Sequence, residues 1–122
     1  MNRKFLITGS FSAFIAVAAG AFGAHILKKH LEIDMLQVFE TAVRYQMYHA
    51  LALIFTGLIM NSSPGRKVEI AGWLFITGTV LFSGSLYILS TTGVKWLGAI
   101  TPLGGIAFLA AWLMLILHFL KK

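Results

Sequence analysis

The sequence predicts an all-α membrane protein, an up-down bundle of four transmembrane helices. Of its 122 residues, 58% are hydrophobic and only 11% are charged, and the mean hydropathy is +0.84. Such values are typical of membrane proteins and not of soluble domains. Long apolar runs recur along the chain, and each is bounded by charged or turn-forming residues. We therefore expect one membrane domain over residues 1–122.

The composition also excludes several classes of function. The chain has no cysteine, which rules out disulfides, thiolate nucleophiles, Cys-ligated zinc and iron–sulfur clusters. The net charge is +6, but Lys and Arg are scattered in ones and twos at the ends of apolar runs. Nucleic-acid binding requires a basic stripe, so we expect no nucleic-acid partner. We expect these cations to anchor the chain to membrane lipid.

The first expected span covers residues 5–25 and follows a short basic head. Head, apolar run and small residues also resemble a secretory signal peptide. Three further spans and a periodic pattern favour a permanent span instead. Small residues recur at every fourth position, which predicts a smooth face for a neighbouring helix: Ser12, Ala16, Gly20 and Ala24.

The other expected spans cover residues 35–60, 69–90 and 96–120. Asp34 followed by Gln37 resembles a capping box and starts the second helix. The polar Pro64-Gly65 turn separates the second span from the third. Pro102 would fall inside the fourth helix, so we expect a kink there.

The distribution of basic residues predicts the orientation of the bundle. With an even number of spans, both termini lie on one side of the membrane. That side holds Arg3, Lys4, Arg66, Lys67, Lys121 and Lys122, against Lys28, Lys29, Lys95 and the boundary residue Arg44 on the other. Because Lys and Arg in short loops set topology, we expect both termini in the cytoplasm and the protein in the cell membrane.

Counting depth at about 1.5 Å per residue puts the polar residues of all four spans in one layer of the outer half. These residues are His25, Tyr45, Gln46, His49, Ser83, Ser85, Tyr87 and Thr101. Polar side chains inside a bilayer either pair with one another or line a wet cavity. The layer is therefore interpreted as a network that holds the helices together, or as a binding site.

Three further expectations concern charge and chemistry. Glu40 and Arg44 are spaced for an ion pair at the membrane boundary. His25 and His49, at similar depth on adjacent helices, are a workable ligand pair for a metal or haem. Hydrogen bonds from these histidines to Tyr or Ser hydroxyls are the alternative, so we assign no metal and no cofactor. The chain has no nucleophile with a placed base, no phosphate loop and no HExxH, and we expect no enzyme.

The polar segments together resemble the signature blocks of a known family. The blocks are Gly20–His25, Tyr45-Gln46 with His49-Ala50-Leu51, Leu81–Tyr87 and Thr101–Gly105. They are similar to a family of small bacterial membrane proteins, domain of unknown function 423, related to eukaryotic transmembrane protein 256. The resemblance covers essentially the whole chain. It implies a multi-pass inner-membrane protein with four spans, and it implies no activity.

The leading functional expectation is a non-enzymatic, multi-pass membrane protein with a structural or membrane-supporting role. The first alternative is binding or transport of a small molecule, lipid or ion through the outer polar pocket. The second is metal or haem binding by His25 and His49. The small size of the chain makes a homo-oligomer an expectation as well.

Overall fold

The computed structural model describes residues 2–121, which are helical without any strand. The first helical segment, called the first rod below, consists of α1, a π-helical turn and α2. The last helical segment consists of a 3₁₀ turn and α5. The bounds are α1 Lys4–Ala18, π turn Ala19–Gly23, α2 Ala24–Leu27, α3 Ile33–Ser62, α4 Arg66–Thr92, 3₁₀ turn Lys95–Ala99 and α5 Thr101–Leu120.

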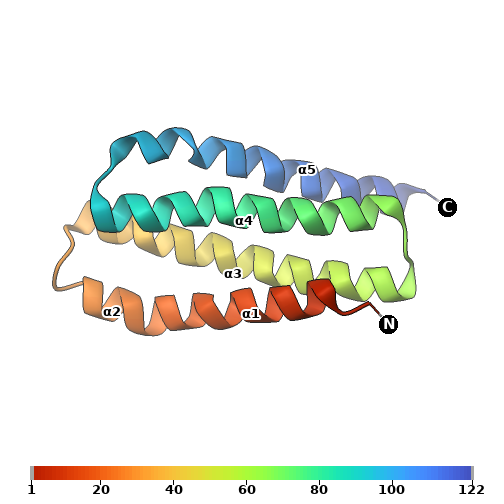
Figure 1. Ribbon diagram of the computed structural model, residues 1–122, viewed down its shortest axis with the longest axis horizontal. Coiled ribbons are helices and arrows are strands. Elements are labelled where there is room, and N and C mark those ends of the chain that lie inside the picture. Colours follow the sequence, from red (N-terminus) through yellow and green to blue (C-terminus); the bar gives the residue numbers. More distant parts are fainter. Residues whose placement is uncertain (1, 122) are drawn as a thin grey trace.

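The helices run up and down in sequence order, which confirms the predicted fold class. Figure 1 shows them as a row of α1, α3, α4 and α5, with both termini at the same end. The closely packed pairs are the sequential ones: α1 with α3, α3 with α4, and α4 with α5. The end that holds both termini is called the terminal end below, and the opposite end is called the loop end.

Three segments are long and apolar enough to cross a membrane: Lys4–Leu27, Arg66–Thr92 and Lys95–Leu120. The α3 helix, with 30 residues, matches them in length. Its first half is more polar than the other spans, because it contains Asp34, Glu40, Arg44, Gln46 and His49. Gln46 and His49 are buried against neighbouring helices, so the bundle itself accommodates part of this polarity.

The small-residue face of the first rod packs against α3, as the spacing predicts. Ala16 is 1% exposed. A Cβ atom added to Gly9 would lie 2.9 Å from the carbonyl oxygen of Ala50 on α3. A side chain at Gly9 would therefore push the two helices apart, and close approach of the backbones explains the small residue.

The α4–α5 contact also has a glycine where the two helices approach closely. The start of α5 further shows that the expected role of Pro102 is wrong. A Cβ atom on Gly104 would lie 2.4 Å from the backbone nitrogen of Phe82 on α4. Pro102 does not kink a helix interior, because the 3₁₀ turn ends before it and Pro102 lies in the first turn of α5. A proline is tolerated there, since the first-turn N–H groups have no partner within the helix.

Candidate functional site

Gln46, near the middle of α3, joins three helices. Its side chain is buried, and its Nε2 donates to the backbone oxygen and to the hydroxyl of Ser12 on α1, at 3.1 and 3.2 Å. Its Oε1 accepts a hydrogen bond from the hydroxyl of Tyr87 on α4, at 2.5 Å. One amide group therefore ties α1, α3 and α4 together.

His49 lies one turn further along α3 and uses both ring nitrogens. Trp112 on α5 donates from Nε1 to His49 Nε2 at 3.2 Å. Since an indole N–H can only donate, Nε2 must accept, and the proton of the neutral ring lies on Nδ1. Nδ1 then donates to the carbonyl oxygen of Tyr45 at 2.8 Å. The imidazole also stacks on Phe108, with ring centres 3.6 Å apart and planes inclined by 4°.

The serines and Thr101 form two separate contacts. The Ser83 hydroxyl donates to the carbonyl oxygen of Ala42 at 2.8 Å and so links α4 to α3. The hydroxyls of Ser85 and Thr101 lie 2.6 Å apart and link α4 to α5 near the loop end. The Ser85 and Thr101 hydroxyls also contact backbone carbonyl oxygens, those of Phe82 at 2.9 Å and Leu97 at 3.4 Å, so this contact ends on the backbone at both sides.

The structure therefore divides the predicted polar layer into several local contacts spread along the bundle. Gln46 and His49 lie near the middle of α3, because this helix begins at Ile33 and several turns with polar residues precede them. His25 is exposed on α2 and takes no part in the hydrogen bonds among residues 2–121. Tyr45 is 38% exposed and packs its ring on Phe82, with centroids 4.6 Å apart.

The predicted Glu40–Arg44 ion pair is wrong in this structure. The only ion pair within residues 2–121 joins Lys4 to Glu69. Arg44 donates instead to the hydroxyl of Thr41, at 3.3 Å. Glu40 and Arg44 are both exposed, and an exposed pair gains too little from contact to hold two long side chains in one geometry.

The geometry of His49 does not fit the metal or haem hypothesis. Nδ1 carries the proton and donates to Tyr45, and the one in-plane lone pair, on Nε2, accepts from Trp112 and is not directed at a ligand. Within the described residues, no group of three His, Cys, Asp or Glu side chains could hold a metal ion.

Sequence reasoning missed three residues that complete these contacts: Ser12, Phe108 and Trp112. The sequence pattern places Ser12 only on the small-residue face. The signal for a further role is its hydroxyl group, which stands among Ala and Gly residues. Trp112 lies in the middle of a span and not in an interfacial belt, which is a signal for a specific partner. Phe108 is one of many apolar residues of α5, and no sequence pattern distinguishes it.

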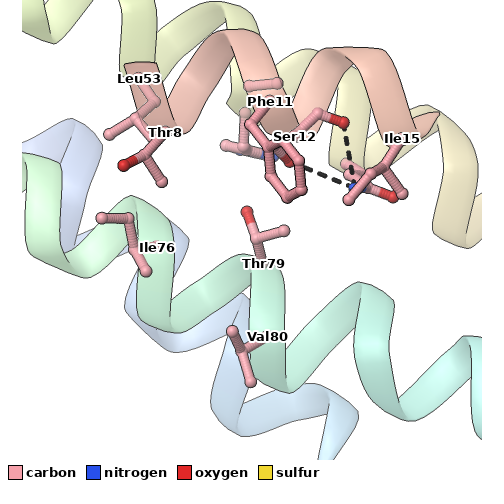
Figure 2. A pocket seen from close by; sticks show the side chains of 11 residues that line it. Thr8, Phe11, Ser12, Ile15, Leu53, Ile76, Thr79 and Val80 are labelled. Carbon is pink, nitrogen blue, oxygen red and sulfur yellow. Dashed lines mark hydrogen bonds between the residues drawn. The ribbon is translucent and has the colours of Figure 1, made fainter. Parts of the chain in front are cut away.

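Two hollows lie on either side of His49. A cavity of about 180 Å³ separates α1 from α4, with α3 behind it, as Figure 2 shows. Thr8 and Thr79 face this cavity. Ser12, Gln46 and His49 also line it, and its other lining residues are apolar. A hollow of about 450 Å³ lies between α3 and α5 and is lined by His49 together with Tyr45, Phe82, Pro102, Gly105, Ile106, Phe108, Leu109 and Trp112.

The interior polar side chains bond either other side chains or backbone carbonyl oxygens. Within residues 2–121, no buried side-chain nitrogen or oxygen atom lacks a hydrogen-bond partner. Together, the apolar spans, the outward apolar faces and this paired interior define a multi-pass helical membrane protein.

The comparisons with known proteins identify the family. The profile described as "Protein of unknown function (DUF423)" matches residues 19–105, and the chain belongs to this family. The chain is 49% identical over 120 residues to the UPF0382 membrane protein YwdK of Bacillus subtilis (strain 168), covering 98% of each chain. It is 50% identical over 119 residues to the UPF0382 membrane protein SH2409 of Staphylococcus haemolyticus, covering 98% of this chain and 97% of the relative. No solved structure matches.

Proposed function

We propose that this protein is a non-enzymatic, structural component of the membrane. The observation that supports the proposal is that every buried polar side-chain atom within residues 2–121 has a hydrogen-bond partner in the protein. Gln46, His49, Ser83 and Ser85 each use their hydrogen bonds to hold helices in register. Such bonds contribute only about 0.6 to 2 kcal/mol each, but they specify which helix faces meet in an apolar medium.

We further propose that the protein lies in the cell membrane with both termini in the cytoplasm. The shared position of the termini at one end supports only the part of this proposal that puts both on the same side of the membrane (Figure 1). Arg3, Lys4, Arg66, Lys67 and Lys121 lie at or next to that end, and Lys28, Lys29 and Lys95 lie at the loop end. A reporter fused after the last residue should read as cytoplasmic, and a periplasmic or extracellular reading would contradict the proposed orientation.

A complementation experiment separates a structural role from a catalytic or ligand-binding role. In a bacterium that lacks its own copy, leakage of a membrane-impermeant DNA dye is measured with and without the protein. We expect the wild-type chain to reduce leakage. The double variant Gln46→Leu/Tyr87→Phe should do the same, because it removes both ends of the buried Gln46–Tyr87 bond together, and only the part-buried groups of Ser12 lose a partner. Loss of complementation by a well-folded double variant would contradict the structural role.

The cavity between α1 and α4 favours a second candidate function, the binding of a small apolar molecule or lipid chain. Its volume of about 180 Å³ and apolar lining suit such a ligand, and the Thr8 and Thr79 hydroxyls could orient one polar group. Native mass spectrometry tests this candidate. A hydrophobic molecule retained by the wild type and lost in Thr8→Phe would support binding, and equal retention by both would contradict it.

The partners follow from the outer surfaces. Large apolar side chains on α1, the π-helical turn and α5 are exposed, among them Phe14, Phe22, Leu109 and Leu120. We propose membrane lipid as the main partner of these faces. A homo-oligomer stays a prediction, and the mass of the protein in detergent, measured by light scattering, tests it.

A further inference from the structure

A third hollow, which is polar, lies at the terminal end, away from Gln46 and His49. It has a volume of about 280 Å³ and is formed by the α3–α4 turn, the start of α4 and the end of α5. Its lining differs from the two apolar hollows because polar side chains dominate it. The lining residues are Ser63, Pro64, Gly65, Arg66, Lys67, His118 and Lys121.

The hollow concentrates positive charge, and no acidic residue of the part that the structure describes lines it. The cations that line it are Arg66, Lys67 and Lys121. The nearest acid on α4, Glu69, pairs with Lys4 and accepts a hydrogen bond from Trp73 at 2.7 Å. That pair is the only ion pair in residues 2–121, so no acidic side chain in this part of the chain neutralises the cations of the hollow.

The backbone and His118 shape the floor of this hollow. Gly65, which precedes α4, has no side chain, and no side chain caps the first turn of the helix. The His118 ring lies 3.4 Å from the position that a Cβ of Gly65 would take, and its Nε2 lies 3.2 Å from the Ser63 hydroxyl. The Ser63 contact joins the turn to α5, and the exposed side chains of Arg66 and Lys121 stand beside it.

We propose that this hollow binds a phosphate group. The group belongs to an anionic lipid headgroup or to a soluble phosphate compound. Lys and Arg donate charge-assisted hydrogen bonds to phosphate oxygens, and free first-turn N–H groups of a helix add to the attraction. The hollow lies at the end of the apolar spans, where lipid headgroups are found. This site goes beyond the structural role, because it depends on none of the residues of the interior contacts.

Native mass spectrometry in a non-ionic detergent tests the site. The purified protein is mixed separately with phosphatidylglycerol, with phosphatidylcholine and with inorganic phosphate, and the tightly retained molecules are counted. The site variant is Arg66→Gln/Lys67→Gln/Lys121→Gln. The control variant Lys28→Gln/Lys29→Gln/Lys95→Gln removes the same charge from the loop end. If the triple site variant does not fold, Lys121→Gln alone replaces it, because Lys121 lies beyond the end of α5.

We expect the wild type and the control variant to retain one phosphatidylglycerol in preference to phosphatidylcholine. The site variant should lose this preference, by about fivefold in affinity for each cation removed. Retention of inorganic phosphate that the site variant loses would support the site with a soluble phosphate as its ligand. An equal loss in both variants would show general surface charge and overturn the proposal. Absence of any phosphate-dependent retention in the wild type would overturn it as well.

Discussion

The hydrogen bond between Gln46 and Tyr87 offers the sharpest test of the interior contacts. Gln46 is 6% exposed and holds Ser12 through Nε2 and Tyr87 through Oε1. In Gln46→Leu, the Tyr87 hydroxyl and the Ser12 groups lose this partner. We expect a loss of about 1 to 3 kcal/mol, the range for a buried polar group left unpaired. Tyr87→Phe removes one bond and should lower stability by about 1 kcal/mol.

The double variant decides how much of this loss belongs to the pair. Because Gln46→Leu and Tyr87→Phe remove the two ends of one bond, their effects should not add. We expect the double variant to be about 1 kcal/mol more stable than the sum of the single losses predicts. The free energy of unfolding is measured by circular dichroism during denaturation in mixed detergent micelles.

A matched control uses a hydroxyl that bonds only its own helix. Thr91 lies at the exposed end of α4, and its Oγ1 donates to the carbonyl oxygen of Tyr87 at 2.9 Å. Thr91→Val should therefore change stability by less than about 0.5 kcal/mol. If Gln46→Leu and Tyr87→Phe add within about 0.3 kcal/mol, the cross-helix bond does not stabilise the bundle, and the reasoning above is refuted.

Three further predictions test the packing, the histidine and the terminal ion pair. Gly104→Val should strongly lower the thermal midpoint, because even a Cβ would lie 2.4 Å from the α4 backbone. The control Gly105→Ala, whose Cβ meets open space, should leave the midpoint within a few degrees of the wild type. Equal midpoints of the two variants would contradict the close approach of the helices. Added haem should keep the Soret band of free haem, and neither haem nor Cu²⁺ should change the midpoint of the wild type, because both His49 nitrogens are engaged. A shifted Soret band that is lost in His49→Phe would revive the haem hypothesis. Lys4→Gln should lower stability by less than about 1 kcal/mol, since the side chains of its ion pair are 40% and 31% exposed. The difference from wild type should shrink in high salt, which screens the pair. A salt-independent loss would point to packing instead.

The sequence by itself determined the membrane class, the helices and much of their packing surface. Long apolar runs admit few alternatives in a bilayer, because every backbone polar group must be paired within the segment. The small residues of the first span, such as Gly9 and Ala16, predicted a face that does pack against α3. The motif blocks also indicated the family that the comparisons then identified.

Two predictions from local sequence patterns were wrong. Pro102 was expected to kink a continuous helix, but a 3₁₀ turn ends just before it and makes it a first-turn residue. Glu40 and Arg44 have ion-pair spacing, yet spacing cannot report exposure, and both side chains lie at the surface. Helix boundaries and exposure depend on neighbours that a local pattern does not describe.

Only the tertiary structure decided which polar groups meet. Gln46 pairs with Tyr87 across 41 positions of sequence, and His49 pairs with Trp112 across 63. Periodicity gives the face of a residue on its own helix, but it does not give the rotation and offset of one helix against another. Those follow from side-chain packing over the whole contact, as at Gly104 and at the Phe108–His49 stack. The same packing separates a predicted common layer into local bonds, and it gathers the cations of the terminal end around one hollow.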